Sequence, residues 1–235
     1  MPDNLLIPSV DLRIGSLEEY NRQQKLKAGL KHGKPQKKRP CLTISREYGC
    51  EGYPVAELLR ETMIRKTGEE WVLIDKAVLE EVARRHNISE EILQGLGEKN
   101  RILNEVFATF SPRWKSDQDY FRLLCRHVVS LAEQGNVIIV ELGGAIITRH
   151  FENAHHYRLY ASQDFKIGSI ARRLGVSSED AEKIVEKQQR LRDHFAKDFL
   201  GQDDHESYHY DILFNNDRNS PEKIAMTIAK HVMAD

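Results

Sequence analysis

The residues best suited to chemistry lie in the short segment REYGCEGY, which follows a β-branched run and precedes an apolar helical pattern. This order predicts a turn from a strand into a helix. Backbone N–H groups at a helix start attract anions, and Gly49 and Gly52 would let a phosphate approach the backbone closely. The segment therefore predicts a phosphate cradle. Its expected cofactor-binding residues are Arg46, Gly49, Cys50, Glu51, Gly52 and Tyr53.

Five short runs rich in Val, Ile, Leu or Tyr are predicted strands, and a helical pattern follows each of them. They cover residues 41–45, 71–74, 137–141, 157–161 and 210–214. Alternation of strands and helices requires crossover connections, so we expect an α/β fold in three layers, with a five-stranded parallel sheet flanked by helices.

The pattern divides the chain into a predicted N-terminal extension, residues 1–40, and one domain, residues 41–235. Between the second and third strands the segment 76–135 is longer than one crossover needs, and it predicts a helical insertion with three helices. A further charged helical segment, 177–202, follows the fourth strand and has Ser177 or Ser178 as its expected N-cap.

Acidic side chains follow two of the predicted strands at the edge where ligands bind in open parallel sheets. Asp75 comes directly after the second strand, and Glu141 ends the third. Both are candidate substrate-binding residues, and Asp75 has an alternative as the N-cap of the next helix. The chain shows no convincing arrangement of metal ligands among its ten histidines, so we predict no protein-built metal site.

Several motifs in this order resemble the cytidylate kinase-like family, a branch of the P-loop nucleoside-monophosphate kinases. They are ISREYGCEGY with its following helix, VLIDKAVLEEV, GNVIIVELGGAIITR, YRLYASQDFKIGSIARRLG and YHYDILFNNDRNSPEKIAMTI. The resemblance implies a P-loop kinase fold in which 76–135 is the substrate-binding insertion and 177–202 the lid. It also implies transfer of the ATP γ-phosphate to a nucleoside monophosphate such as CMP, with Mg²⁺.

Phosphoryl transfer needs cations around the transferred group, and arginine matches phosphate oxygens well. Collinearity with the family makes Arg172, Arg190 and Arg192 the candidate catalytic residues, with Arg173 as a further donor. The alternative to a catalytic role is that these arginines are solvated surface residues of charged helices.

The chain departs from an ordinary P-loop at three positions. Gly52 occupies the place of the phosphate-binding lysine, Tyr53 that of the magnesium-binding Ser or Thr, and Leu142 that of an arginine in the family. Arg46 either supplies the missing charge or is an exposed arginine paired with Glu47 or Glu51. The departures leave a second hypothesis open, a non-catalytic nucleotide-binding or regulatory protein that kept the kinase fold.

Charge is unevenly distributed in this chain of 235 residues with a formal net charge of −1. Residues 22–39 hold eight basic residues and no acidic one, so the remainder is acidic, which argues against a nucleic-acid binder except through this basic arm. A third hypothesis makes the arm the contact surface of an interaction protein. Three isolated cysteines indicate reduced thiols, and no segment resembles a membrane span, so we predict a cytoplasmic protein without a membrane partner. The sequence gives no oligomeric state.

Overall fold

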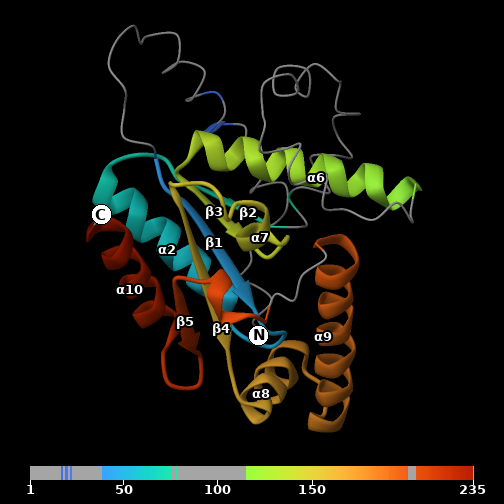
Figure 1. The fold of residues 1–235 in the computed structure, drawn as a ribbon. Helices are drawn as coiled ribbons and strands as arrows, with labels where there is room; N and C mark the ends of the chain where they lie inside the picture. Colours follow the sequence, from blue (N-terminus) through green and yellow to red (C-terminus); the bar gives the residue numbers. More distant parts are fainter. Residues whose placement is uncertain are drawn as a thin grey trace, which may run out of the picture.

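The computed structural model describes residues 39–75, 78, 115–200 and 205–234, together with residues 17, 19, 20 and 22. These residues form a five-stranded, all-parallel sheet between two layers of helices (Figure 1). The predicted α/β architecture is confirmed.

All five predicted strands are present, and their order across the sheet is β2-β3-β1-β4-β5. Their bounds are β1 (Cys41–Arg46), β2 (Val72–Ile74), β3 (Val137–Val140), β4 (Ala154–Tyr160) and β5 (Ile212–Asn215). Strand β4 begins three residues before its predicted start because Ala154 already pairs with Cys41.

The helices divide between the two faces of the sheet (Figure 1). On one face lie α2 (Gly52–Thr67) and α10 (Pro221–Ala234), which pack against Leu42, Ile44 and Leu159. On the other face lie α6 (Lys115–Gln134) and the short α7 (Gly144–Ile147). Successive strand residues point to opposite faces, so both layers bury apolar side chains of the same strands.

Beyond the end of β4, α8 (Gln163–Leu174) and α9 (Ser178–Leu200) pack side by side. Ile170 of α8 and Ala181 and Val185 of α9 form a small apolar cluster between them. Ser177 is the N-cap of α9, because its Oγ accepts a hydrogen bond of 3.1 Å from the Asp180 amide. Helix α9 therefore begins where the predicted lid begins, and its function as a lid stays a prediction.

The predicted N-terminal extension contributes to the core. Leu17 and Tyr20 are buried in the hydrophobic cluster beneath α6, and the Tyr20 hydroxyl donates a hydrogen bond to the Gly135 carbonyl. A short 3₁₀ segment, η2 (Ser207–His209), precedes β5. The basic arm lies outside the described residues over 23–38, as do two of the three predicted insertion helices. The boundary at residue 40 and the assignment of the insertion stay predictions.

In the part of the chain that the structure describes, none of the helices combines the length and apolar character that crossing a bilayer requires.

Candidate phosphate-binding site

The turn from β1 into α2 lies at the carboxyl edge of the sheet, beside the end of β3. The Glu141 amide donates a hydrogen bond of 2.9 Å to the Ile44 carbonyl, which fixes Glu141 next to Arg46. The crossovers that leave β1 and β3 run in opposite directions across the sheet. Open α/β sheets bind ligands at such a switch point.

Gly49 brings this turn into direct contact with α8. Its φ of +100° favours glycine, and a Cβ atom there would lie 2.7 Å from the Cβ of Lys166. The Lys166 ammonium group in turn lies 3.0 Å from a carboxylate oxygen of Glu47. The turn is thus fixed to α8 by close backbone packing and by an ion pair.

Gly52 leaves room for the side chain of Arg46. A Cβ atom at position 52 would lie 2.3 Å from the Arg46 Cδ. The Arg46 Nη1 donates a hydrogen bond of 2.8 Å to the Cys50 carbonyl. An arginine from the strand end therefore occupies the space into which a side chain at position 52 would extend.

The environment of Arg46 excludes one of the two interpretations made from the sequence, and the other, that Arg46 supplies the missing charge, stays a prediction. Its side chain is only 16% exposed, and its ion-pair partner is Glu141, with 3.6 Å between Nε and Oε1. Glu47 pairs with Lys166, and the Glu51 carboxylate lies near Asn216. The alternative of an exposed arginine paired with Glu47 or Glu51 is wrong.

Burial and neighbouring cations lower the pKa of Arg46 to about 10. Desolvation is the largest cause, and the positive charges of Arg192 and Arg173 add to it, whereas Glu141 opposes it. Arg46 still carries its charge at neutral pH. Because burial causes most of this shift, the pKa itself does not measure the local charge, but Arg192 and Arg173 do bring further positive charge close to Arg46.

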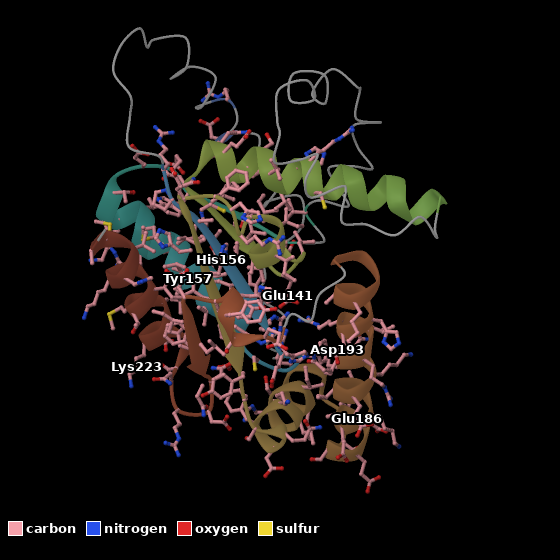
Figure 2. The ribbon with its side chains drawn as sticks, in the orientation of Figure 1. Glu141, His156, Tyr157, Glu186, Asp193 and Lys223 are labelled. Atoms are coloured by element: carbon pink, nitrogen blue, oxygen red, sulfur yellow. The ribbon has the colours of Figure 1, made fainter. Side chains whose placement is uncertain are left out.

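Glu141, labelled in Figure 2, pairs with the guanidinium groups of two arginines, the first of which is Arg46. Its other partner is Arg192 of α9, which contacts Oε2 directly and donates a second hydrogen bond of 3.2 Å to the Arg46 carbonyl. The Arg192 guanidinium also lies 5.2 Å from the centre of the Tyr48 ring. Arg192 thus connects α9 to both the turn and the end of β3.

The backbone after β3 is strained. Glu141 and Leu142 have φ values of +67° and +63°, in the left-handed region that non-glycine residues adopt at a cost of about 1 kcal/mol or more each. The Leu142 side chain is buried in the cluster beneath α6. Glu141 therefore stays at the sheet edge at a conformational cost.

Several amides of the turn already have acceptors. The Tyr48 amide donates to Oε1 of Gln189, the Glu51 amide to Oδ1 of Asn216, both at 2.8 Å, and the Cys50 amide to the Glu47 carbonyl. Within the described residues, the amides of Gly49 and Gly52 have no hydrogen-bond acceptor. The cradle is open at its two glycines and closed by protein oxygens at its flanks.

Cys50 and Tyr53 contribute their backbone to the turn. Both side chains are buried in the hydrophobic cluster that α2 and α10 form with the sheet. Burial raises the pKa of the Cys50 thiol to about 12, so the thiol is protonated at neutral pH. Cys50 thus fills the tight turn as a small buried residue, and the Tyr53 side chain lies in the core, where the usual Ser or Thr of a P-loop would present a hydroxyl to the metal.

The candidate arginines lie in different environments. Arg192 is in the contacts described above, and Arg173 is near enough to Arg46 to lower its pKa. Arg172 is exposed, and Arg190 is exposed with a long 4.0 Å pairing to Glu186, one turn earlier on α9. Figure 2 labels Glu186. The catalytic role of each arginine stays a prediction.

The spacing of residues along α8 and α9 could have shown from the sequence which arginines face the turn. Arg173 follows buried Ile170 by three residues, and Arg192 follows buried Val185 by seven, so each lies on its helix's inner face. Gln189 also lies on that face of α9. Sequence reasoning missed Gln189 and Asn216 as partners of the turn amides, because the chain separates them by well over a hundred residues from the turn.

Asp75 follows β2 at the same edge and caps the next segment. Its Oδ1 accepts a hydrogen bond of 3.0 Å from the Val78 amide, as the capping alternative predicted. A substrate contact by Asp75 stays a prediction. Among the residues described by the structure, no group of three or more His, Cys, Asp or Glu side chains is placed to hold a metal ion.

A family model described as the cytidylate kinase-like family matches residues 41–218. This chain belongs to the cytidylate kinase-like family. The match begins at β1 and includes the turn, the edge of β3, α8 and α9, so the site described above lies inside it. The resemblance drawn from the sequence motifs is confirmed.

The chain is similar to several solved structures. An uncharacterized protein from Eubacterium ventriosum ATCC 27560 is 18% identical, with a TM-score of 0.61, over 84% of this chain and 100% of that chain. A gluconokinase from Sinorhizobium meliloti 1021 is 12% identical, with a TM-score of 0.43, over 85% and 98%. A shikimate kinase from Bacteroides thetaiotaomicron is 13% identical, with a TM-score of 0.41, over 83% and 98%. A search of curated proteins gave no significant match. The family match and the order of the strands in the sheet show that the fold is that of the P-loop kinases.

Proposed function

We propose that this protein is a phosphotransferase that moves the γ-phosphate of ATP to a nucleoside monophosphate, CMP or a similar acceptor. The observation that carries the proposal is the position of Arg46 across Gly52, inside a strand-to-helix turn at the carboxyl edge of a parallel sheet. The phosphate-binding charge has moved from the helix to the end of the strand before it.

The residues around the turn fit a polyphosphate chain. The amides of Gly49 and Gly52 would bind phosphate oxygens, with Arg46 and Arg192 as charged donors beside the turn. The Arg46 Nε is buried and has no hydrogen-bond partner among the described residues. A buried donor without an acceptor is costly, and a phosphate oxygen would satisfy it.

Mg²⁺ would enter bound to the phosphates, since this ion is commonly held by one or two carboxylates together with substrate oxygens. Glu141 and Asp75 are the carboxylates at the sheet edge that we propose for metal-bound water or the acceptor. When bound, the ion neutralises charge on the phosphates. The chain's own contribution is to orient the phosphates with the turn amides and to bring arginines to the transferred group.

Arg172 and Arg190 are exposed to solvent in this structure, and we propose that movement of α8 and α9 brings them to the transferred phosphate. Lids of kinases close over bound substrates and exclude water from the reaction. The proposed site of action is the cytoplasm, consistent with three cysteines that are all free and buried.

A second function is supported by Tyr53 and Leu142, whose side chains are both buried in hydrophobic clusters. Neither can supply the metal ligand or the phosphate-binding arginine that the family pattern has at these positions. A protein that binds nucleotide without transferring phosphate would need neither group.

One experiment separates the two functions. ATP binding is measured by isothermal titration calorimetry, and ADP release is measured with a coupled assay against a panel of nucleoside monophosphates. The kinase proposal predicts ATP binding and ADP formation that depends on one acceptor. Binding without turnover for any acceptor would select the regulatory function, and absence of ATP binding would contradict both.

A further inference from the structure

Three oxygen-bearing side chains surround the turn from three separate elements. Gln189 of α9 and Asn216 after β5 accept hydrogen bonds from turn amides, and Glu141 after β3 pairs with Arg46 and Arg192. Amide N–H groups at a helix start and arginine guanidinium groups are the donors that a phosphate would use. The protein's own oxygens thus occupy donors that the proposed ligand needs.

Glu141 is the only charged member of these three side chains, and its conformation and burial cost free energy. It holds a left-handed backbone conformation, and its Oε1 is buried without a hydrogen-bond partner among the described residues. The Arg46 Nε lies 3.6 Å from this oxygen, so the contact is an ion pair without a formed hydrogen bond. The Glu141–Arg46 pair is therefore an incomplete substitute for a phosphate oxygen.

Helix α9 delivers two groups to the same place. Gln189 and Arg192 are three residues apart on its inner face, and one reaches the Tyr48 amide while the other reaches Glu141. The Gln189 amide nitrogen donates to Asp193, which pairs with His205 at 2.9 Å. The position of Gln189 is thus fixed from within α9 and from the segment before β5.

We propose that Glu141 is an internal competitor of the phosphate chain: its carboxylate holds Arg46 and Arg192 in the ligand-free protein and lowers the affinity of the turn for polyphosphate. Phosphate binding transfers both guanidinium groups from Glu141 to the ligand, and the Gln189 oxygen leaves the Tyr48 amide. Glu141 is a positioning residue in this scheme, since it acts through the arginines. The inference rests on the proposed function, because it assumes that phosphates bind at the turn.

The test measures the affinity for inorganic triphosphate by calorimetry in EDTA, so that a metal role of Glu141 does not enter. Glu141→Gln keeps the size of the side chain and removes its charge, and we expect about tenfold tighter binding, the order of one charge-assisted hydrogen bond. Glu182→Gln is the matched control, because Glu182 is an exposed residue of α9 and loses the same charge. We expect no change in affinity for it.

Two further variants test whether Glu141 acts through Arg192 and whether Gln189 competes for the Tyr48 amide. In an Arg192→Ala background the gain from Glu141→Gln should shrink, because residues that act through one contact are not additive. Gln189→Ala, at a partly exposed position of α9, should tighten triphosphate binding about threefold by freeing the Tyr48 amide, and urea unfolding of this variant checks that it still folds.

The outcomes are distinguishable. Equal or weaker binding by Glu141→Gln, with wild type and control binding normally, overturns the competitor role of Glu141 and leaves the proposed function standing. If Glu141→Gln raises triphosphate affinity equally in the wild-type and Arg192→Ala backgrounds, the competitor role of Glu141 is also overturned. If no variant and no wild-type protein binds triphosphate or ATP, the proposed function fails, and this inference fails with it.

Discussion

Arg46 and Gly52 are complementary at the scale of single residues. The arginine stem lies where a Cβ atom at position 52 would be, so one residue can be large only if the other is glycine. In an ordinary P-loop the charge is on the helix residue, and the strand end is small. The two arrangements bring positive charge to the same turn from opposite sides.

Restoring the lysine alone should therefore harm the protein. Gly52→Lys forces Arg46 away from the Cys50 carbonyl, and overpacking of this kind typically costs about 1–3 kcal/mol. Urea unfolding should show this loss in the free energy of unfolding. Gly168→Ala is the control, since a Cβ atom there has open space, and it should be neutral or slightly stabilising. Wild-type stability of Gly52→Lys would contradict the complementarity.

Cys50 should be unreactive although it lies inside the candidate site. Its thiol is fully buried, and its pKa is raised to about 12, so thiolate is scarce at pH 8. Mass spectrometry after treatment of the native protein with iodoacetamide at pH 8 should show Cys50 unmodified. Rapid labelling that ATP suppresses would instead indicate an exposed, reactive thiol in the cradle.

At the scale of elements, β1 and β4 are connected by a buried polar pair. Thr43 Oγ1 and His156 Nδ1 are 2.8 Å apart across the two strands. Burial is the main cause that lowers the pKa of His156 to about 4, and Asp211 only partly offsets it. Between about pH 6.5 and pH 4, His156 is therefore protonated in the unfolded chain and neutral in the folded protein.

Stability should fall as pH falls through this window. The contribution of His156 is fully present above pH 6.5 and is lost toward pH 4, with a total on the order of 3 kcal/mol. Urea unfolding at a series of pH values should show a flatter acid limb for His156→Gln than for wild type. Equal pH dependence in the two proteins would mean that His156 does not titrate in this way.

The strands and the turn could be predicted from the sequence, whereas some contacts between elements could not. Strand periodicity and the following helices predicted five strands, and the motif at β1 predicted the turn. The spacing of Ala181 and Val185 marks the apolar face of α9, and it could have shown that Arg192 lies on this face and Arg190 does not. The contacts of Gln189 and Asn216 with the turn could not, because they depend on how distant segments pack and leave no local pattern.

At the scale of the whole molecule, the N-terminal segment belongs partly to the core. Tyr20 is 2% exposed and contacts the backbone before β3 through its hydroxyl. The sequence placed Tyr20 in an extension before the domain, because an apolar side chain in a helix does not show which distant element covers it.

Tyr20→Ala should lower the free energy of unfolding by about 3 kcal/mol, as expected for truncation of a buried aromatic side chain. Thermal and urea unfolding measure this loss. Arg22→Ala is a suitable comparison, since Arg22 is exposed and pairs only with nearby Glu19 among the contacts described for it, and it should change stability little. If both variants unfold like wild type, the N-terminal segment contributes nothing to the core.

The basic arm remains the basis of the third hypothesis, a contact surface for RNA or a protein partner. Deletion of residues 1–16 and neutralisation of the lysines in 23–38 would keep Tyr20 in place. If the arm is the functional surface, retention of RNA or partner falls while ATP affinity is unchanged. If the arm is a solvated tail, neither quantity changes.

Arg46 is proposed to replace the P-loop lysine, and ATP calorimetry on charge-swapped variants tests this replacement. Arg46→Ala should weaken ATP binding about tenfold to a hundredfold, the range for loss of a charged donor. Arg46→Ala combined with Gly52→Lys should recover part of that affinity, because the lysine then has the space that the arginine left. Unchanged ATP affinity in Arg46→Ala would contradict the claim.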